Sequence, residues 1–365
     1  MLIFFKKNFR RFFQSALAFL VFTILPFNLS AKEDQKKPFL TLRGVSHVHT
    51  IYSHDSNASL TDVLNAMSLD QFDFAIVTDH NDIKGRLSYR AMKTEADPIL
   101  VFANEVSAKD GHLIALGVNE MPSESFTSQE LIDWIHEKKG YAILAHPLSV
   151  KEPWNNFNVT DWDGFEVYNF AHDLYEKDIV SFGLDLHDGD EDKVLRTVQE
   201  LSPASRKFWD ETLEKRHVTA VVGSNVHLKR DLKYFRAALK SAVQYVLVSD
   251  RSEQALIDAF GQGRSYMVFE TYGRADKFSF TAKQGDVEFQ IADTVTGLKN
   301  VKFNIIVGEK AKIQLIHHGN VVKEETGESL SYDPTDLGAY RVEVYKGDKL
   351  WIFTNPIYIE EEAAL

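Results

Sequence analysis

The chain contains no cysteine. A protein without cysteine has no disulfide, no thiolate zinc site and no lipid anchor attached through a cysteine. If the protein is exported, its fold must be held together by its packed core and by any metal ions that it binds.

Positively charged residues are outnumbered by negatively charged ones. Lys and Arg number 41 against 53 Asp and Glu, so the formal net charge is −12. This balance argues against nucleic acid, including a duplex, as a general partner. It does not exclude an anionic substrate, because bound divalent cations reverse the local sign of the charge.

No apolar run has the length that a membrane span prefers. The stretch from about Phe12 to Phe27 falls short of roughly 20 residues, and it contains Pro26. It follows a basic segment over residues 6–11 and precedes the small residue Ala31. This pattern predicts a signal peptide over residues 1–31 and a bacterial periplasmic or secreted protein; the alternative is an uncleaved membrane anchor. Cleavage would change the net charge to −12 − 4 = −16.

After a predicted linker over residues 32–41, strand-like and helix-like segments alternate to about residue 271. The expected strands cover residues 44–49, 72–77, 99–102, 112–116, 141–145, 165–168, 218–222 and 244–248. Helices are expected at 59–69, 127–140, 174–216 and 253–261, with Ser59 and the Thr127–Glu130 pair as N-terminal caps. Repeated alternation of this kind predicts a parallel sheet or barrel.

From about residue 272 the pattern changes to short alternating runs separated by Gly and Asp turns. These runs cover residues 278–280, 287–291, 301–307, 313–317, 340–345 and 350–353. They predict a small all-β sandwich of immunoglobulin-like size over residues 272–365.

His and acidic residues stand at the ends of the strand-like runs of the first region. The positions are His47, His49, His54, Asp55, Asp79, His80, Glu105, His112, His146, Asn225 and His227. In a barrel of parallel strands such ends meet at one rim, where imidazoles and carboxylates suit a metal site. A lone His-x-His pattern would be weak, since histidines often simply pack; the joint pattern is more specific. Other histidines, among them His136, His172 and His317, fit helix-surface or loop positions.

These segments resemble the PHP (polymerase and histidinol phosphatase) superfamily of metal-dependent hydrolases, and look closest to its exported CehA/McbA-like branch. The matching segments are HVHT at 47–50, TDHN at 78–81, Glu105, GHLIALG at 111–117, AHP at 145–147, FEVYN at 165–169 and GSNVH at 223–227. The resemblance covers about residues 42–269. It implies an α/β fold, a distorted (β/α)7 barrel over residues 42–271 followed by the β-sandwich.

The resemblance also implies two or three divalent ions of zinc, manganese or iron. One ion would be held by His47, His49 and Glu105. Glu105 would bridge to a second ion held by His112 and His146. A third would take His80, His227 and residue 54. The sequence departs from the family at two places: His54-Asp55 replaces Asp-Gly, which leaves Asp55 as an alternative ligand, and Asn225 replaces an Asp.

The resulting function hypothesis is an exported phosphoesterase that acts on a small-molecule or lipid-derived phosphate mono- or diester. Bound cations lower the pKa of a water towards ~7 and so supply hydroxide. Asp79, Glu105 and His227 are the expected catalytic residues, with Asp79 orienting a ligand imidazole. The expected substrate-binding residues are Lys84, Arg86, Glu166, Asn169, Lys229 and Arg230. The alternatives are a carboxylesterase or amide hydrolase on the same metals, and a catalytically impaired metal- or ligand-binding protein.

Overall fold

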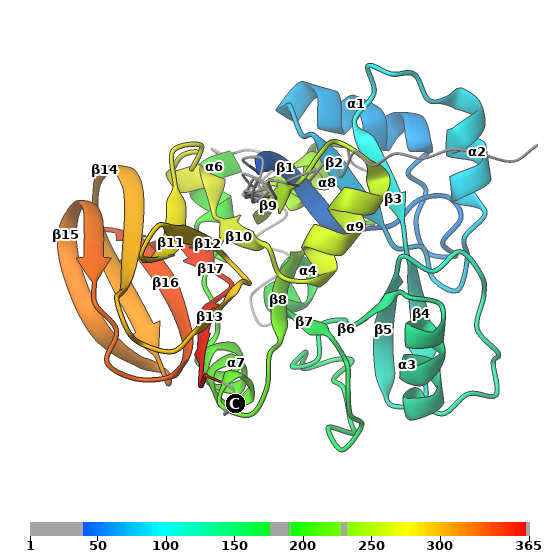
Figure 1. Ribbon diagram of the computed structural model, residues 1–365. Coiled ribbons are helices and arrows are strands. Elements are labelled where there is room, and N and C mark those ends of the chain that lie inside the picture. Colours follow the sequence, from blue (N-terminus) through cyan, green and yellow to red (C-terminus); the bar gives the residue numbers. More distant parts are fainter. Residues whose placement is uncertain (1–38, 176–188, 190, 228–231, 363–365) are drawn as a thin grey trace, which may run out of the picture. The chain divides into compact units, whose positions relative to one another are not determined.

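The computed structural model describes residues 39–175, 189, 191–227 and 232–362 (Figure 1). The predicted signal peptide, most of the predicted linker, Lys229 and Arg230 lie outside these residues. All described residues belong to one compact unit. Within them, no helix is both long enough and apolar enough to cross a membrane.

Two sheets build the α/β part. The first begins with three parallel strands, β1 (Leu40–Val48), β2 (Phe74–Val77) and β3 (Ile99–Phe102). The second has the order β4-β5-β6-β7-β8. Its strands are β4 (Asn104–Ala108), β5 (Gly111–Leu116), β6 (Tyr141–Leu144), β7 (Gly164–Asn169) and β8 (Thr219–Gly223). The first three of these are antiparallel neighbours, whereas β6, β7 and β8 are parallel.

The two sheets meet at two places, and both lie beside candidate ligands. At one junction His80 bridges to Glu105, and at the other Val48 bridges to Val226. Across the second junction His49 donates its backbone N–H to the carbonyl of Val226 at 3.1 Å. The strands β1 to β3 and β4 to β8 therefore form a ring.

Several helices pack against these strands. They are α1 (Leu60–Asp70), α2 (Gly85–Met92), α3 (Ser128–Glu137), α4 (Phe170–Tyr175), α6 (Glu191–Leu195), α7 (Pro203–Leu213), α8 (Leu232–Lys240) and α9 (Glu253–Gly261). Among their contacts, α9 packs on β3 and β9 (Val243–Val248), α3 on β6, and α8 on β1. The predicted caps at Ser59 and Thr127 are confirmed as capping boxes, because each side chain accepts the backbone N–H three residues ahead.

The core explains why the central strands are apolar throughout. All four residues of β2 are buried. Phe74 and Ile76 pack in one apolar cluster and Ala75 and Val77 in the other. A strand covered on both faces loses the polar alternation of a half-exposed strand.

The helix expected over residues 174–216 is wrong as one element. Within the described residues, α6 ends at Leu195 and α7 begins at Pro203. Ser202 caps α7, and Pro203 occupies a first-turn position that needs no N–H donor. Charged residues on both sides of this break conceal it in the sequence.

The C-terminal region is almost entirely β-structure. It follows β10 (Ser265–Val268) and the 3₁₀ turn η1 (Glu270–Tyr272). Its strands are β11 (Ser279–Gln284), β12 (Val287–Gln290), β13 (Thr294–Thr296), β14 (Val301–His317), β15 (Asn320–Tyr332), β16 (Gly338–Lys346), β17 (Lys349–Thr354) and β18 (Ile357–Glu360). Two expected runs are one strand, β14, with a register shift between Ile306 and Ala311. The sequence pattern missed β15, because most of its residues are polar and exposed.

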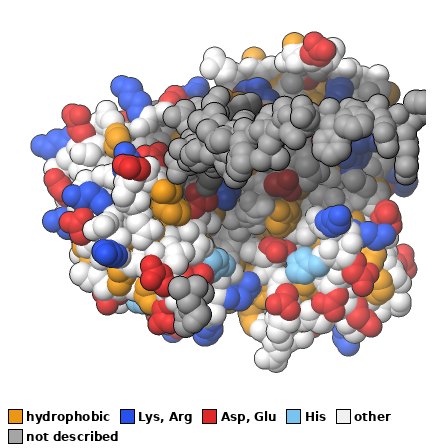
Figure 2. Space-filling model, in the orientation of Figure 1, with side chains coloured by type: hydrophobic (Ala, Val, Ile, Leu, Met, Phe, Trp, Pro, Cys, Tyr) orange, Lys and Arg blue, Asp and Glu red, His pale blue; other side chains and the backbone are white. Residues whose placement is uncertain are grey.

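One sheet runs across the predicted boundary at residue 271. Its order is β12-β11-β14-β16-β17-β10-β9-β1-β2-β3, so β17 pairs with β10 and β9 pairs with β1. The domain boundary at residue 271 therefore remains a prediction. The sheet itself is continuous across this position. Figure 2 shows acidic and basic side chains interspersed over one face of the described residues, so the net negative charge is not gathered into one patch there.

Candidate metal centre

Glu105 lies at the centre of a buried group of histidines. Its side chain is 1% exposed, and its two carboxylate oxygens face different imidazoles. Oε2 lies 3.1 Å from His47 Nε2, 3.2 Å from His49 Nε2 and 3.3 Å from His80 Nδ1. Oε1 lies 3.1 Å from both His112 Nδ1 and His146 Nε2. Such a carboxylate is placed to bridge cations on its two sides.

Strand ends bring most of these residues together, whereas Glu105 and His112 stand near the beginnings of β4 and β5. His47 and His49 stand at the end of β1, and His80 follows β2. Glu105 and His112 belong to the β4–β5 hairpin, where residues 107 and 112 are direct partners. His146 follows β6, and Asn225 and His227 follow β8.

The donor atoms fall into overlapping groups, within each of which they lie no more than 4.8 Å apart. The groups are His47, Glu105 and His146; His49, Asp55, His80 and His227; His80, Glu105 and His112; and His112, His146 and Glu152. Sets of His and carboxylate donors of this size suit divalent cations.

His47 and His49 both lie beside Oε2 of Glu105, but they enter different groups: His47 with His146, and His49 with Asp55, His80 and His227. The reason is local. β1 has an irregularity between Val45 and Val48, and His47 has a φ of 60°. Strict strand alternation, which would turn both imidazoles the same way, is broken there.

Asp55, and not His54, joins the histidine group. Its Oδ2 lies 2.9 Å from His227 Nε2 and 3.6 Å from His80 Nε2. Buried Ser53 fixes it by donating to Asp55 Oδ1 at 2.8 Å. His54 is exposed and lies in the wall of the pocket beside the group.

Oxygen atoms outside the cluster determine which ring nitrogen of several histidines carries the proton. His47 Nδ1 lies 2.7 Å from Glu166 Oε1. His146 Nδ1 and His227 Nδ1 lie 3.3 and 3.2 Å from the carbonyls of Glu152 and Asn225. Because these oxygens only accept, Nδ1 is a donor in each ring, and Nε2 is the nitrogen that a cation in the cluster could bind.

The buried charges in the cluster fit a cation. Imidazoles around Glu105 hold its carboxyl pKa well below its usual range, although burial opposes ionisation. Burial lowers the pKa of His49 to about 3, so its ring is neutral. Its Nε2 then faces an ionised carboxylate oxygen without a hydrogen bond, and His80 Nδ1 and His227 Nε2 also lack hydrogen-bond partners. A lone pair opposite a carboxylate is repulsive, and a cation bound by both atoms would remove this repulsion.

His47 differs from His49 in its electrostatic surroundings. Burial disfavours its charged form, but the carboxylates of Glu166 and Glu105 outweigh this and raise the pKa of His47 to about 10. A cation bound at His47 therefore has to displace a proton, so metal binding competes with acid.

A cavity of about 420 Å³ opens onto this cluster. It is lined by His54, Asp55, His80, Glu105, Ser107, His112, His146, Lys151, Glu152, Ala171, His172, Asn225 and His227. The cavity is large enough for a small substrate to reach the metal-binding atoms.

The expected substrate-binding residues are placed differently from the expectation. Glu166 is fully buried behind His47 and also accepts the backbone N–H of His146 at 2.8 Å. Asn169 donates to Glu166 Oε2 at 2.6 Å. Both therefore support ligands and do not line the pocket. Lys84 is exposed and pairs with Asp82, and Arg86 pairs with Glu253.

Asp79 supports the chain next to His80 and does not orient an imidazole. It accepts the backbone N–H and the hydroxyl of Thr50 at 2.6 and 2.7 Å. Burial raises its pKa to about 6. It thereby ties the end of β1 to the end of β2.

Sequence reasoning missed three titratable residues of the pocket. His172, assigned to a surface position, is buried and stacks on His146 with ring centroids 3.9 Å apart. Among the described residues, Lys151 is the positively charged residue that lines the pocket, and its neighbour in the chain, Glu152, lines it too. The available signals were that Lys151 and Glu152 closely follow the AHP motif and that His172 closely follows FEVYN.

No family model matches the chain. The uncharacterized protein MJ1587 of Methanocaldococcus jannaschii is 29% identical over 138 residues, which are 34% of this chain and 81% of that protein. A two-domain protein from Bacteroides vulgatus, described as containing a predicted PHP-like metal-dependent phosphoesterase, is similar over 87% of this chain and 95% of its own, at 14% identity and a TM-score of 0.46. PsfC from Pseudomonas syringae is similar over 63% and 91%, at 11% identity and a TM-score of 0.40. These likenesses are too distant to carry a function, which has to come from the site itself.

Proposed function

We propose that the chain is a metal-dependent hydrolase of phosphate mono- or diesters. The observation that carries the proposal is Glu105, whose two buried oxygens face five imidazole nitrogens from two sides. A site with several adjacent cations is suited to phosphoryl transfer, where negative charge spreads over several oxygens.

The chain's own residues would hold two or three ions of zinc, manganese or iron. His47, Glu105 and His146 form one set of donors, and His49, Asp55, His80 and His227 form another. His112 adds a donor on the Oε1 side of Glu105. When bound, divalent ions provide an acidic water and neutralise charge on phosphoryl oxygens.

The surrounding residues keep these donors in position. Glu166 fixes the ring of His47, and Ser53 fixes Asp55. The burial of Glu105 shields its carboxylate oxygens from bulk water and would strengthen their interaction with a cation. Lys151 in the pocket wall is suited to attract an anionic substrate.

The proposal includes membership of the PHP superfamily, in its exported CehA/McbA-like branch. The ring of strands would be the distorted (β/α)7 barrel, and residues 272–365 the immunoglobulin-like domain. The protein would be exported by residues 1–31 to the periplasm or the medium, with a small-molecule or lipid-derived phosphate ester as its substrate.

The test is an assay of the protein recovered after expression of the full chain and loading with manganese or zinc. The substrates are an aryl phosphate monoester, an aryl phosphodiester and an aryl carboxylic ester, each with a chelator control. We expect chelator-sensitive turnover of a phosphate ester. Turnover of the carboxylic ester alone would replace the proposal by an esterase, and silence on all three with metal bound would contradict it.

Glu105→Gln provides the matched site variant. It keeps the shape of the side chain and removes the charge that faces the imidazoles, so bound metal and turnover should both fall, turnover by about a hundredfold or more. Glu328→Gln, on the exposed face of β15, is the control and should change neither. Equal activity of the two variants would show that Glu105 is not part of the site.

A further inference from the structure

Two Ser–His pairs flank the metal centre. In the first pair the histidine donates a hydrogen bond to the serine, and in the second pair the serine donates to the histidine. In the first pair, Ser53 donates its hydroxyl to Asp55 Oδ1 at 2.8 Å and accepts the backbone N–H of His80 at 3.2 Å. Because its only proton is used, Ser53 accepts from His49 Nδ1 at 3.1 Å. His49 therefore presents its Nε2 lone pair to the metal cluster.

In the second pair the serine oxygen is saturated instead. Ser149 Oγ accepts the backbone N–H groups of Lys151 and Glu152 at 3.1 and 3.2 Å. A hydroxyl oxygen has two lone pairs, so only the O–H remains for its contact with His172 Nδ1. Ser149 thus donates, His172 Nδ1 accepts, and the neutral ring carries its proton on Nε2.

The ring of His172 lies in the wall of the pocket. The residue is 7% exposed, and its ring stacks on His146 at an interplanar angle of 20°. Its backbone N–H donates to Asn169 Oδ1 at 3.2 Å, and Asn169 bonds Glu166. The same buried network therefore positions His172 and the candidate ligand His47.

The Nε2 side of the ring faces the pocket. Nδ1 is turned to Ser149, whereas Nε2 lies 3.9 Å from Oε2 of Glu152, another pocket-lining residue. A nitrogen that carries a proton has no lone pair for a cation. His172 is therefore not suited to be a metal ligand, although its ring stacks on that of the candidate ligand His146. An N–H donor next to a cationic centre is instead suited to an anionic oxygen.

We propose that His172 is a substrate-contacting residue, which donates its Nε2–H to an anionic oxygen of the phosphate ester bound at the metal centre. Ser149 is the positioning residue that keeps the proton on Nε2. The proposal rests on the proposed function for the identity of the substrate. The arrangement of protons on the two Ser–His pairs stands independently of it.

The first test reads the tautomers directly, by ¹⁵N NMR of the full chain with labelled histidine and zinc bound. We expect the His172 signal, assigned by its loss in His172→Gln, to report a neutral ring protonated on Nε2. Ser149→Ala should shift that ring towards the Nδ1–H form. A wild-type His172 protonated on Nδ1, or on both nitrogens at neutral pH, would overturn the proposal.

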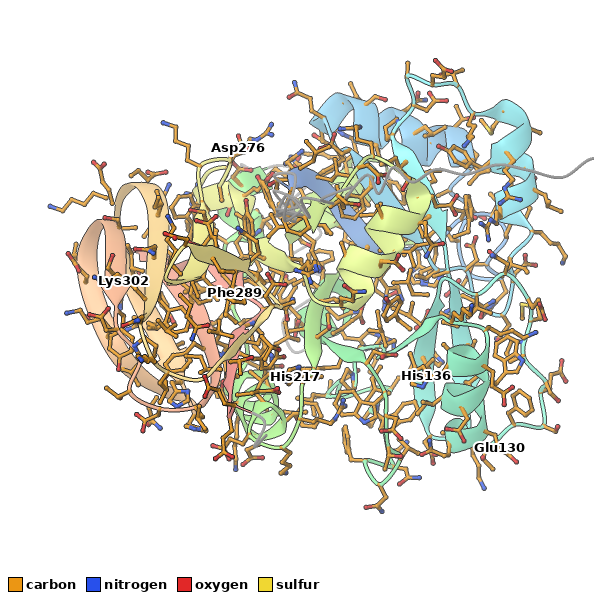
Figure 3. The ribbon with its side chains drawn as sticks, viewed as in Figure 1. Glu130, His136, His217, Asp276, Phe289 and Lys302 are labelled. Carbon is orange, nitrogen blue, oxygen red and sulfur yellow. The ribbon has the colours of Figure 1, made fainter. Side chains whose placement is uncertain are left out.

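The second test uses inorganic phosphate as the probe, titrated calorimetrically into the zinc-loaded protein. His172→Phe should weaken phosphate binding about 10- to 100-fold, the loss of one hydrogen bond to a charged group, with the zinc content unchanged. His172→Gln, which keeps an N–H donor, should recover part of the affinity. His217→Gln, on the exposed residue labelled in Figure 3, is the control.

The outcomes separate the two proposals. Unchanged phosphate affinity in His172→Phe, loss of zinc from both His172 variants, or absence of phosphate binding to the wild type would overturn the role of His172. Phosphate binding that depends on His172 without turnover of any phosphate ester would leave that role standing and contradict the phosphoesterase. Turnover of a phosphate ester that is unchanged in His172→Phe would support the phosphoesterase and contradict the role of His172.

Discussion

At the scale of single residues, the site works by assigning each polar atom one task. Glu105 supplies charge to both sides of the cluster, while Glu166 and Ser53 act one layer behind, on His47 and His49. The neighbouring oxygens thus decide which imidazole nitrogen remains available to a cation.

Asn225→Asp is the most informative single change in the cluster. Asn225 is 6% exposed, lines the pocket and has a φ of 44°, a conformation that Asp tolerates nearly as well as Asn. A carboxylate there adds negative charge to the pocket that His227 and Asp55 also line, so metal affinity should rise about tenfold or more, measured by competition with a chelator. The metal-free variant should be less stable, because the added charge is buried.

The same variant tests whether the wild type is an impaired enzyme. If hydrolysis is absent in the wild type and appears only in Asn225→Asp, the natural protein is a binding protein. If the wild type already turns over and the variant changes only its metal dependence, that alternative fails.

His317, on β14, should make stability depend on pH. Burial lowers its pKa, its Nδ1 donates to the carbonyl of Ala339 at 3.0 Å, and its ring stacks on Tyr340. In the unfolded chain this histidine binds a proton at about pH 6.5, whereas in the folded protein it stays neutral at that pH. The free energy of unfolding therefore falls as the pH drops through this range. Urea unfolding between about pH 7 and 5 should show a smaller loss in His317→Phe than in the wild type; parallel losses would contradict the prediction.

At the scale of elements, the last residue of β8, Gly223, lies so close to the carboxylate of Glu166 that no side chain fits there. A Cβ on Gly223 would lie 2.0 Å from Glu166 Oε1 and 3.0 Å from Asn169 Nδ2. Gly223 is therefore required for space, because Glu166 must reach His47.

Gly223→Ala should displace Glu166 and weaken metal binding about 10- to 100-fold, the usual cost of disturbing a group that orients a metal ligand. Metal content after dialysis at fixed free zinc would measure the effect. Gly327→Ala is the matched control, because nothing lies closer than 3.6 Å to its added Cβ. Equal zinc retention by the two variants would mean that Glu166 has room to move.

At the scale of the whole molecule, the C-terminal strands hold the α/β part together. Asn355, directly after β17, accepts the backbone N–H of Ala220 on β8 at 2.8 Å and donates to the carbonyl of the same residue at 2.9 Å. Its amide also donates to Ser265 Oγ at 3.1 Å. A side chain from the C-terminal β region thus replaces a strand partner for β8, the strand that leads to His227.

Removal of this amide should destabilise the entire unit. Asn355→Ala leaves buried backbone groups of Ala220 without partners, so the free energy of unfolding should fall by about 1–3 kcal/mol. Because one sheet joins the two regions, tryptophan fluorescence and circular dichroism should report a single urea transition in both proteins. Two separate transitions would contradict this picture; exposed Asn158→Ala is the control.

The sequence by itself determined the elements and the chemistry of the site. Apolar runs ending in His and acidic residues located β1, β2, β3 and β6, and the caps at Ser59 and Thr127 located two helices. These signals are local, because strand burial and helix capping depend on residues a few positions apart. The polar strand β15 and the break before Pro203 escaped, since charge on an exposed face carries no period-two signal.

Only the tertiary structure decided how the site residues divide their tasks. It sorted His47 and His49 into different groups, chose Asp55 over His54, moved Glu166 and Asn169 out of the pocket and brought His172 and Lys151 into it. It also joined both regions through one sheet. Each of these depends on residues that are distant in the chain and close in space, and a residue's function follows the atoms that it touches, which its sequence neighbours do not specify.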